Sequence, residues 1–363
     1  MKPLVGFDWP SAQAKQLAYI SQDRHIHEFH VGNGGVWQEA DLTTLTGAPL
    51  AISRFLIGYV WPQEGTKQIT YLGSEGQIHE LCVSAGGTWQ HSNLSALAGA
   101  PPAIQITAGY SWTAGNAKQI VYVGDDSHLH ELSMVAGQPW RHVDLNVLTN
   151  APLPGSHSMV GYEWTDRCSK QLIYVARDGH VHELFCRAGS IWEHMDLTEL
   201  VHAPRAVDVM VGYEWRDARS QQIAIVSEDG HIHELYMVPG QSWQHVDLTT
   251  ITSAPAATNI LTGYAWDQGH SKQIAYVGLD GHIHELYVES GQNWRHVDLT
   301  AISHAPITPI TSLVGYGWSA GNSKQVTYVD NEGNVCELWM PYHNNWQATN
   351  LSSLVRSAVP VRF

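Results

Sequence analysis

One four-residue landmark, Gly-aromatic-x-Trp, occurs seven times and sets the main constraint on what this chain can fold into. Successive copies begin 51 or 52 residues apart, and no long stretch of the 363-residue chain falls outside this period. A period of this length indicates seven copies of one structural unit, not the two or three unrelated domains that length alone suggests. The landmarks begin at Gly6, Gly58, Gly109, Gly161, Gly212, Gly263 and Gly315.

Each unit contains four short runs of the kind that forms β-strands. In the sixth unit these runs lie around Gly263–Trp266, Lys272–Val277, Ile283–Tyr287 and Trp294–Leu299. They are rich in aromatic and β-branched residues and are bounded by Gly, Asn, Asp or Pro. An Asp-Gly pair between the second and third runs, as at Asp280, is typical of a tight hairpin. We therefore expect four antiparallel strands in every unit.

Seven such units predict an all-β fold, a seven-bladed β-propeller with four antiparallel strands per blade. The whole chain, residues 1–363, forms one domain in this interpretation. A stacked solenoid would need polar capping repeats at its ends, whereas both terminal units keep the aromatic landmarks. The predicted repeats span residues 1–53, 54–104, 105–156, 157–207, 208–258, 259–310 and 311–363.

Composition narrows the class of protein. The chain has 34 acidic residues against 19 Lys and Arg, with a formal net charge of −15, which argues against a nucleic-acid partner. No apolar run approaches the roughly 18 residues of a membrane helix, and the first residues lack the apolar core of a signal peptide. We expect no membrane insertion and a cytoplasmic location, with release by a route that needs no signal peptide left open. The oligomeric state is not predicted.

A glutamate recurs in the third strand of all seven units, inside an apolar run. A carboxylate there is costly to bury unless a partner neutralises or hydrogen-bonds it. One interpretation is an ion pair with a second-strand Lys of the neighbouring blade, drawn from Lys15, Lys67, Lys118, Lys170, Lys272 and Lys324. The other is a carboxylate that receives ligand hydroxyls in a cleft between blades. The glutamates are Glu28, Glu80, Glu131, Glu183, Glu234, Glu285 and Glu337.

A second-strand glutamine and two tryptophans also recur in all seven units. Carboxylate and amide groups together bind vicinal sugar hydroxyls, and an aromatic ring stacks on the apolar face of a sugar. Recurring tryptophans are also typical of an inter-blade core, so we expect at most one of the two columns to line a site. The predicted sugar-binding glutamines are Gln16, Gln68, Gln119, Gln171, Gln222, Gln273 and Gln325, and the tryptophans are Trp9, Trp61, Trp112, Trp164, Trp215, Trp266 and Trp318.

The repeated pattern of a hydrophobic-Tyr strand, Asp-Gly, x-Ile-x-Glu-Leu and a following Trp resembles the fucose-binding β-propeller lectins of fungi and bacteria, which include six- and seven-bladed forms. The resemblance covers the full chain. It implies sugar sites between adjacent blades, held by a third-strand Glu, a second-strand Arg and aromatic stacking. The Glu carries over to Glu28 and its six equivalents. The Arg is replaced by Gln273 and its equivalents, so the resemblance implies sugar binding without specifying fucose.

Histidines offer an alternative chemistry, because 16 of the 22 fall into three repeat columns. In the sixth unit these are His282, His284 and His296, the last within His-x-Asp. Histidines two apart share a strand face, and a neighbouring His-x-Asp could complete a site for zinc or another transition metal. The competing interpretation is that these imidazoles hydrogen-bond to backbone, Asp or ligand. No metal site or cofactor follows from the sequence alone.

The favoured interpretation is a multivalent carbohydrate-binding protein, a lectin, whose partners are glycans on cell surfaces or glycoconjugates. An enzyme is disfavoured because a catalytic constellation normally exists once, whereas these residues recur in every unit. A metal-binding or metal-dependent protein that uses the histidine columns is the alternative. A protein-interaction scaffold that uses the Ala-Pro loops, as at Ala254-Pro255, is the third.

Overall fold

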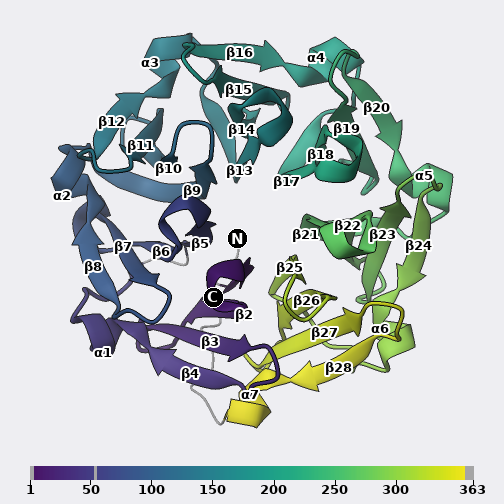
Figure 1. Cartoon of the computed structure of the whole chain (residues 1–363). Coiled ribbons are helices and arrows are strands. Elements are labelled where there is room, and N and C mark those ends of the chain that lie inside the picture. Colours follow the sequence, from purple (N-terminus) through teal and green to yellow (C-terminus); the bar gives the residue numbers. More distant parts are fainter. Residues whose placement is uncertain (1–3, 53–54, 356–363) are drawn as a thin grey trace.

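The computed structural model describes residues 4–52 and 55–355, and they form seven four-stranded antiparallel sheets arranged in a ring (Figure 1). Each sheet takes four consecutive strands in chain order, so every blade is one uninterrupted segment. This confirms the seven-bladed propeller.

The strand bounds are as follows. Blade 1 comprises β1 (Leu4–Trp9), β2 (Ala14–Ile20), β3 (Ile26–Gly32) and β4 (Gln38–Asp41), and blade 2 comprises β5 (Leu56–Trp61), β6 (Thr66–Leu72), β7 (Ile78–Ser84) and β8 (Gln90–Asn93). Blade 3 comprises β9 (Ala103–Trp112), β10 (Ala117–Gly124), β11 (Leu129–Val135) and β12 (Arg141–Asp144), and blade 4 comprises β13 (Pro154–Trp164), β14 (Ser169–Ala176), β15 (Val181–Arg187) and β16 (Trp192–Asp196). Blade 5 comprises β17 (Ala206–Trp215), β18 (Ser220–Ser227), β19 (Ile232–Met237) and β20 (Gln244–Asp247), and blade 6 comprises β21 (Ala257–Trp266), β22 (Ser271–Gly278), β23 (Ile283–Glu289) and β24 (Arg295–Asp298). Blade 7 comprises β25 (Ser312–Trp318), β26 (Ser323–Val329), β27 (Val335–Pro341) and β28 (Gln347–Asn350).

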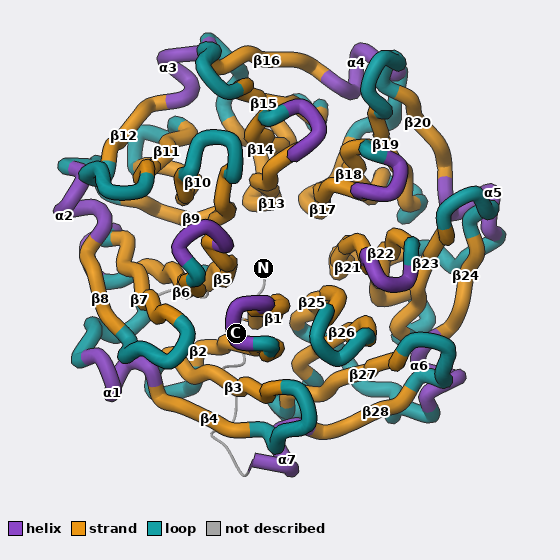
Figure 2. The backbone as a smooth tube through the Cα atoms, in the orientation of Figure 1, coloured by secondary structure: helices purple, strands orange, loops and turns teal. Residues whose placement is uncertain are grey.

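The first strand of each blade is innermost and the fourth is outermost (Figure 2). The seven first strands surround a central cavity of about 620 Å³, lined largely by aliphatic side chains and glycines. The sequence left the channel-lining strand undecided, and the structure assigns this place to the first strand.

A five-residue helix follows the fourth strand of each blade at the outer rim. The residue before the helix caps it: the Asp298 side chain accepts a hydrogen bond from the Ala301 amide, which satisfies one of the free N–H groups of the first turn. The Asp of the His-x-Asp pattern is thus a helix cap. The helices are α1 (Leu42–Thr46), α2 (Leu94–Ala98), α3 (Leu145–Thr149), α4 (Leu197–Val201), α5 (Leu248–Thr252), α6 (Leu299–Ser303) and α7 (Leu351–Val355).

Single 3-10 turns occur mainly between the first and second strands. They are η1 (Pro10–Ala12), η2 (Pro62–Glu64), η4 (Thr165–Arg167), η5 (Arg216–Ala218) and η6 (Asp267–Gly269), with η3 (Ser74–Gly76) in a second-to-third-strand hairpin. The predicted Asp-Gly hairpins are present, with positive φ at Gly179, Gly230 and Gly281. None of the helices in the described ranges has the length and apolarity needed to cross a membrane.

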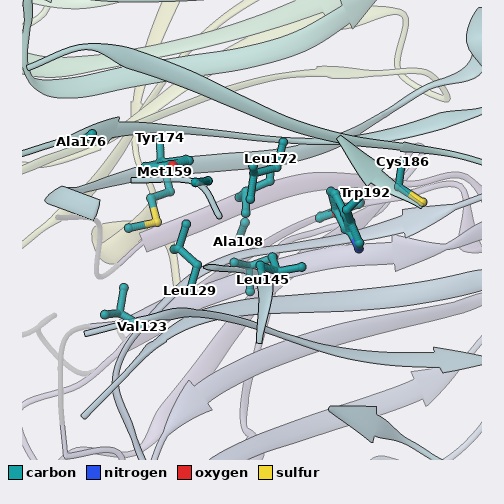
Figure 3. Packing of buried hydrophobic residues seen from close by; sticks show 14 residues of the cluster. Ala108, Val123, Leu129, Leu145, Met159, Leu172, Tyr174, Ala176, Cys186 and Trp192 are labelled. Atoms are coloured by element: carbon teal, nitrogen blue, oxygen red, sulfur yellow. The ribbon is translucent and has the colours of Figure 1, made fainter. Parts of the chain in front are cut away.

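The hydrophobic core is divided among the seven junctions between adjacent blades. At the junction of blades 3 and 4, Ala108 and Leu145 of blade 3 pack in one cluster with Leu172 and Trp192 of blade 4 (Figure 3). Both faces of each sheet are therefore covered by a neighbour, which explains why residues on both faces of a third strand are buried. Ile283 and Glu285 on one face, and His284 on the other, are all nearly inaccessible.

The landmark glycine allows neighbouring blades to approach closely. A Cβ placed at Gly161 would lie 2.3 Å from the Tyr110 ring of the preceding blade, and one at Gly58 would lie 2.4 Å from the Phe7 ring. The aromatic residue of one landmark thus occupies the space that the next landmark glycine leaves free. The same contact closes the ring, because Gly6 of blade 1 faces Tyr316 of blade 7.

The strands do not follow the predicted repeat boundaries to the residue. β9, β13, β17 and β21 begin two or three residues before the boundaries at 105, 157, 208 and 259, because these first strands extend upstream of the aromatic landmark. The terminal segments 1–3 and 356–363 and the first boundary at 53/54 lie outside the described residues.

Candidate functional site

The recurring glutamates lie in the clefts between adjacent blades, and six of the seven form ion pairs with a second-strand Lys of the following blade. The Nζ–Oε distances range from 2.5 to 2.7 Å. This is the first of the two interpretations of the glutamate, so these carboxylates are not free acceptors. The pairs are Lys15–Glu337, Lys67–Glu28, Lys118–Glu80, Lys170–Glu131, Lys272–Glu234 and Lys324–Glu285.

Burial shifts the pKa of both partners in two of these ion pairs. Desolvation raises the pKa of Glu234 and lowers the pKa of Lys272, while the attraction between the two groups opposes both shifts. Glu28 and Lys67 behave in the same way. Removing one member of such a pair would leave an uncompensated buried charge, which is strongly destabilising. The pair is therefore a structural element of the cleft as well as its charged floor.

Two of the recurring glutamines accept hydrogen bonds from lysines of these pairs. Gln222 Oε1 accepts a hydrogen bond from Lys272 Nζ at 2.7 Å, and Gln16 Oε1 accepts one from Lys67 Nζ at 2.8 Å. In five blades the glutamine Nε2 donates to a hydroxyl two residues earlier in its strand, as Gln222 does to Ser220 at 2.6 Å. In Gln222 that bond leaves Oε1 free to accept from Lys272, whereas the Oε1 atoms of the other four glutamines have no donor among the described residues.

Both tryptophan columns line the clefts, which corrects the prediction that at most one would. Lys272 Nζ lies 5.1 Å from the ring centroid of Trp215 in blade 5 and 4.9 Å from that of Trp294 in blade 6. The first-column Trp comes from the end of a first strand. The second-column Trp comes from the next blade, in the loop before its fourth strand or, for Trp192, at the first residue of that strand. The second column, absent from the predicted site residues, is Trp37, Trp89, Trp140, Trp192, Trp243, Trp294 and Trp346.

The cleft between blades 5 and 6 encloses a cavity of about 540 Å³. Glu234 and Lys272 form its charged part, and aromatic rings form much of its wall. Amides at the rim, Gln292 and Asn293, add hydrogen-bonding groups. The cleft thus offers a charged floor, aromatic walls and a polar rim within one cavity. Its aromatic lining is Trp215, Tyr236 and Trp294.

An exposed aliphatic side chain stands in each short helix, and in blade 5 this residue, Ile251, lines the cavity. The seven equivalents are between 46 and 63 % exposed, although aliphatic residues are usually buried. The sequence signal was the repeated Leu-x-x-Leu or Leu-x-x-Ile after the fourth strand, and it was not used in the predictions. We call this set the rim aliphatics: Leu45, Leu97, Leu148, Leu200, Ile251, Ile302 and Leu354.

The histidine columns form a separate hydrogen-bonded layer in blades 1 to 6, and blade 7 has no histidine at these positions. First-column histidines share a hydrogen bond with the helix-capping Asp, as His282 Nδ1 does with Asp298 Oδ2 at 2.7 Å. Second- and third-column histidines contact each other in five blades, as His284 Nδ1 does with His296 Nε2 at 3.0 Å. Burial lowers the pKa of His79 in this layer to about 4, and the nearby His91 adds to the shift. Most of these imidazoles therefore hydrogen-bond to one another or to the caps, whereas Nε2 of His27 and Nε2 of His182 have no hydrogen-bond partner among the described residues.

The structure brings together the alternative metal-ligand set, but each of its three histidines already has at least one hydrogen-bond partner. Both nitrogens of His284 are engaged, Nδ1 by His296 and Nε2 by Asp280 at 3.1 Å. Two other groups have potential ligand atoms within 4.8 Å of one another: Asp229, His231 and His233, and Asp126, His130 and Asp144. In these groups too the carboxylates accept hydrogen bonds from imidazole or backbone. Metal binding remains a prediction.

The fold and the inter-blade clefts define a class of protein, the seven-bladed β-propellers related in structure to propeller lectins. No protein-family model matches the chain, and no curated protein sequence matches it. Among solved structures, the chain resembles the BP39L lectin from Burkholderia pseudomallei, with a TM-score of 0.77, 13 % identity and 99 % of both chains covered.

Two fungal structures are similar over most of their length. AofleA from Arthrobotrys oligospora gives a TM-score of 0.54 at 13 % identity, covering 96 % of this chain and 87 % of that one. The Aleuria aurantia lectin, described as a six-bladed β-propeller with a novel fucose recognition mode, gives 0.53 at 13 % identity, covering 84 % and 94 %. At this identity the likeness establishes the shared propeller fold.

Proposed function

We propose that the protein is a lectin that binds glycans in the clefts between its blades. The observation that carries the proposal is the cavity between blades 5 and 6, where Trp215, Trp294 and Tyr236 surround the Lys272–Glu234 pair beneath rim amides. Aromatic faces suit the C–H face of a sugar, and the amides and ion pair suit its hydroxyls. The propeller lectins with the same fold support this function by analogy of structure.

Repetition of the cleft around the ring favours multivalent binding. A single cleft of this kind binds a sugar weakly, but several on one rigid ring raise the avidity for a glycan-coated surface through effective concentration. The ion pair holds both tryptophans in place, so the recognition surface is preorganised. In this proposal Glu and Gln act mainly by fixing Lys, while the aromatic rings and the rim make most of the direct contact with sugar.

A variant of the rim aliphatics tests the proposal without disturbing the buried pairs. Replacing all seven with Ser is expected to abolish binding on a glycan array, because in this proposal each one forms the apolar edge of its cleft as Ile251 does between blades 5 and 6. Ile251→Ser alone is expected to weaken binding only modestly. The matched control combines Leu279→Ser and Ile307→Ser, which change residues that are 72 % and 65 % exposed and lie outside the cavity lining.

The array is read with and without a chelator, and thermal melts confirm that each variant is folded. Binding by the control and wild type, with loss in the sevenfold variant, supports the proposal. Equal binding by the sevenfold variant, or no glycan binding by wild type, contradicts it. Loss of wild-type binding on chelation would instead favour the metal alternative.

A further inference from the structure

The cleft between blades 4 and 5 differs from the other six because Gln221 stands where they have Lys. Gln221 has the same strand register, opposite Glu214 on β17 and Met237 on β19, as Lys272 has opposite Ala265 and Val288. Its shorter, neutral side chain brings no ammonium group to Glu183, the recurring glutamate of this cleft. Among residues 4–52 and 55–355, no Lys or Arg forms an ion pair with Glu183.

Glu183 has also lost the tyrosine contact found in other blades. In blade 2, Tyr59 Oη donates to Glu80 at 3.1 Å, whereas in blade 4 the equivalent Tyr162 Oη donates to Gln221 Oε1 at 3.0 Å. Glu183 is 2 % exposed, and its Oε1 has no hydrogen-bond donor within the described part of the chain. Burial raises the pKa of Glu183 to about 8, and hydrogen bonding to the Gln221 side chain and the charge of Arg187 oppose this shift.

The rest of the lysine environment remains in place. Gln171 Nε2 is held by Ser169 at 2.9 Å, and its buried Oε1 lacks a donor in the described residues. Trp243, the second-column tryptophan of blade 5, is buried at this junction. Trp164 of the first column donates Nε1 to the Arg219 carbonyl at 3.2 Å. An unpaired carboxyl oxygen and two aromatic rings thus surround the position of an ammonium group that this chain does not supply. The unpaired Gln171 oxygen does not distinguish this cleft, because Gln119 and Gln325 Oε1 also lack a donor in clefts that keep their Lys.

Nearby positive charges are mostly neutralised by partners of their own. Arg187 pairs with Glu193 at 3.3 Å, and Arg219 pairs with Asp166 at 2.6 Å. Arg167 is exposed and lies over the Trp164 ring at 5.4 Å. None of these guanidinium groups forms an ion pair with Glu183 in the described structure, so no cation of the described chain accompanies this buried carboxyl when it ionises.

We propose that the cleft between blades 4 and 5 binds a small ligand through a primary ammonium group, which takes the place that lysine Nζ occupies in the other clefts. In those clefts Nζ lies 2.5 to 2.7 Å from the glutamate and 4.5 to 5.9 Å from the two tryptophan rings. A primary ammonium has three N–H donors and a charge that attracts aromatic faces. An amine or amino sugar meets this requirement, and an N-acetylated sugar does not.

Calorimetric titration with methylammonium chloride, at constant ionic strength in sodium chloride, tests the site without involving sugar. Wild type is expected to have one site. Gln221→Lys supplies the ammonium within the chain and is expected to have none, and Glu183→Gln is expected to weaken binding at least tenfold. Lys272→Gln creates the same vacancy between blades 5 and 6 and is expected to have two sites. Glucosamine is expected to compete with methylammonium, and N-acetylglucosamine is not.

Failure of wild type to bind methylammonium, or equal binding by folded Gln221→Lys, overturns the inference. Binding of methylammonium by Glu183→Gln with the affinity of wild type also overturns it, because the carboxylate would then not contribute to binding. The lectin proposal is tested separately: the glycan array can fail while methylammonium binds, and Gln221→Lys is expected to keep array binding through the other six clefts.

Discussion

At the residue scale, the lysine of the second strand decides the chemistry of each cleft. The same glutamate is an ion-pair partner where Lys follows 38 or 39 residues later, as in Glu234 and Lys272, and a protonatable acid where Gln221 stands instead. A single substitution within a repeated pattern therefore creates a chemically distinct site. The sequence showed Gln221 as one of several scattered departures, and only its position beside Glu183 gives it this consequence.

The raised pKa of Glu183 predicts a specific pH dependence of stability. The folded protein holds this proton up to a pH of about 8, whereas the unfolded chain releases it near 4.5, so unfolding is favoured as pH rises through this window. Glu183→Gln removes this contribution. We expect urea denaturation between pH 5 and 9 to show that the stability of the variant relative to wild type increases as pH rises. The difference between their free energies of unfolding should change by a few kcal/mol in favour of the variant. A constant difference across that range contradicts the prediction.

At the scale of elements, the strands are specified locally but their packing depends on the landmark glycine. The four-strand unit follows from β-branched and aromatic runs between turn residues, and the short helices follow from Asp or Asn caps such as Asp298. The close approach of blades is a property of pairs of elements. Strand β13 fits beside β9 because Gly161 leaves space for the Tyr110 ring.

Gly161→Ala is expected to destabilise the fold by about 1 to 3 kcal/mol, because the added methyl would lie 2.3 Å from Tyr110 and overpack the junction. Gly32→Ala at the end of β3 is the matched control, since no atom lies within 4 Å of its added Cβ. Chemical denaturation of both variants measures the difference. Equal free energies of unfolding for the two variants would contradict the prediction, because the junction would then accommodate the added methyl without destabilisation.

At the scale of the whole molecule, contacts between blades close the ring and repeat the histidine layer. Lys15 of blade 1 binds Glu337 of blade 7 at 2.7 Å, so the pair that holds neighbouring blades also joins the first blade to the last. Repetition multiplies each small effect, because a contact made once per blade is made several times per molecule. The pH response of the histidines is of this kind.

Acid is expected to destabilise the ring cooperatively between about pH 6.5 and 4. Burial lowers the folded-state pKa of His30 and of eight histidines in the repeat columns, so the unfolded chain binds protons first as pH falls and stability is lost through this window. The raised pKa values of Glu28, Glu183 and Glu234 oppose this loss of stability, but these three glutamates are fewer than the histidines. The eight histidines of the repeat columns are His79, His91, His142, His182, His194, His233, His245 and His296.

Urea unfolding at a series of pH values checks this response. A variant with Gln in place of all five third-column histidines is expected to show a shallower decline, because each His–His contact then has one titrating ring. An unchanged slope would place the acid sensitivity elsewhere. The replaced residues are His91, His142, His194, His245 and His296.

The sequence alone was sufficient to predict the repeat period, the four strands of each blade and the recurring Glu, Gln and Trp. These features follow from local residue patterns and from comparison of the seven internal copies. Which residues meet was decided by the tertiary structure. Glu234 could have faced solvent, ligand or Lys272, and the sequence left these alternatives open because the contact joins different blades. The contact of both tryptophan columns with one lysine also could not be predicted from the sequence, because the two rings come from different blades. Short-range physics fixes a strand and its faces, whereas a partner across a junction depends on how whole blades pack.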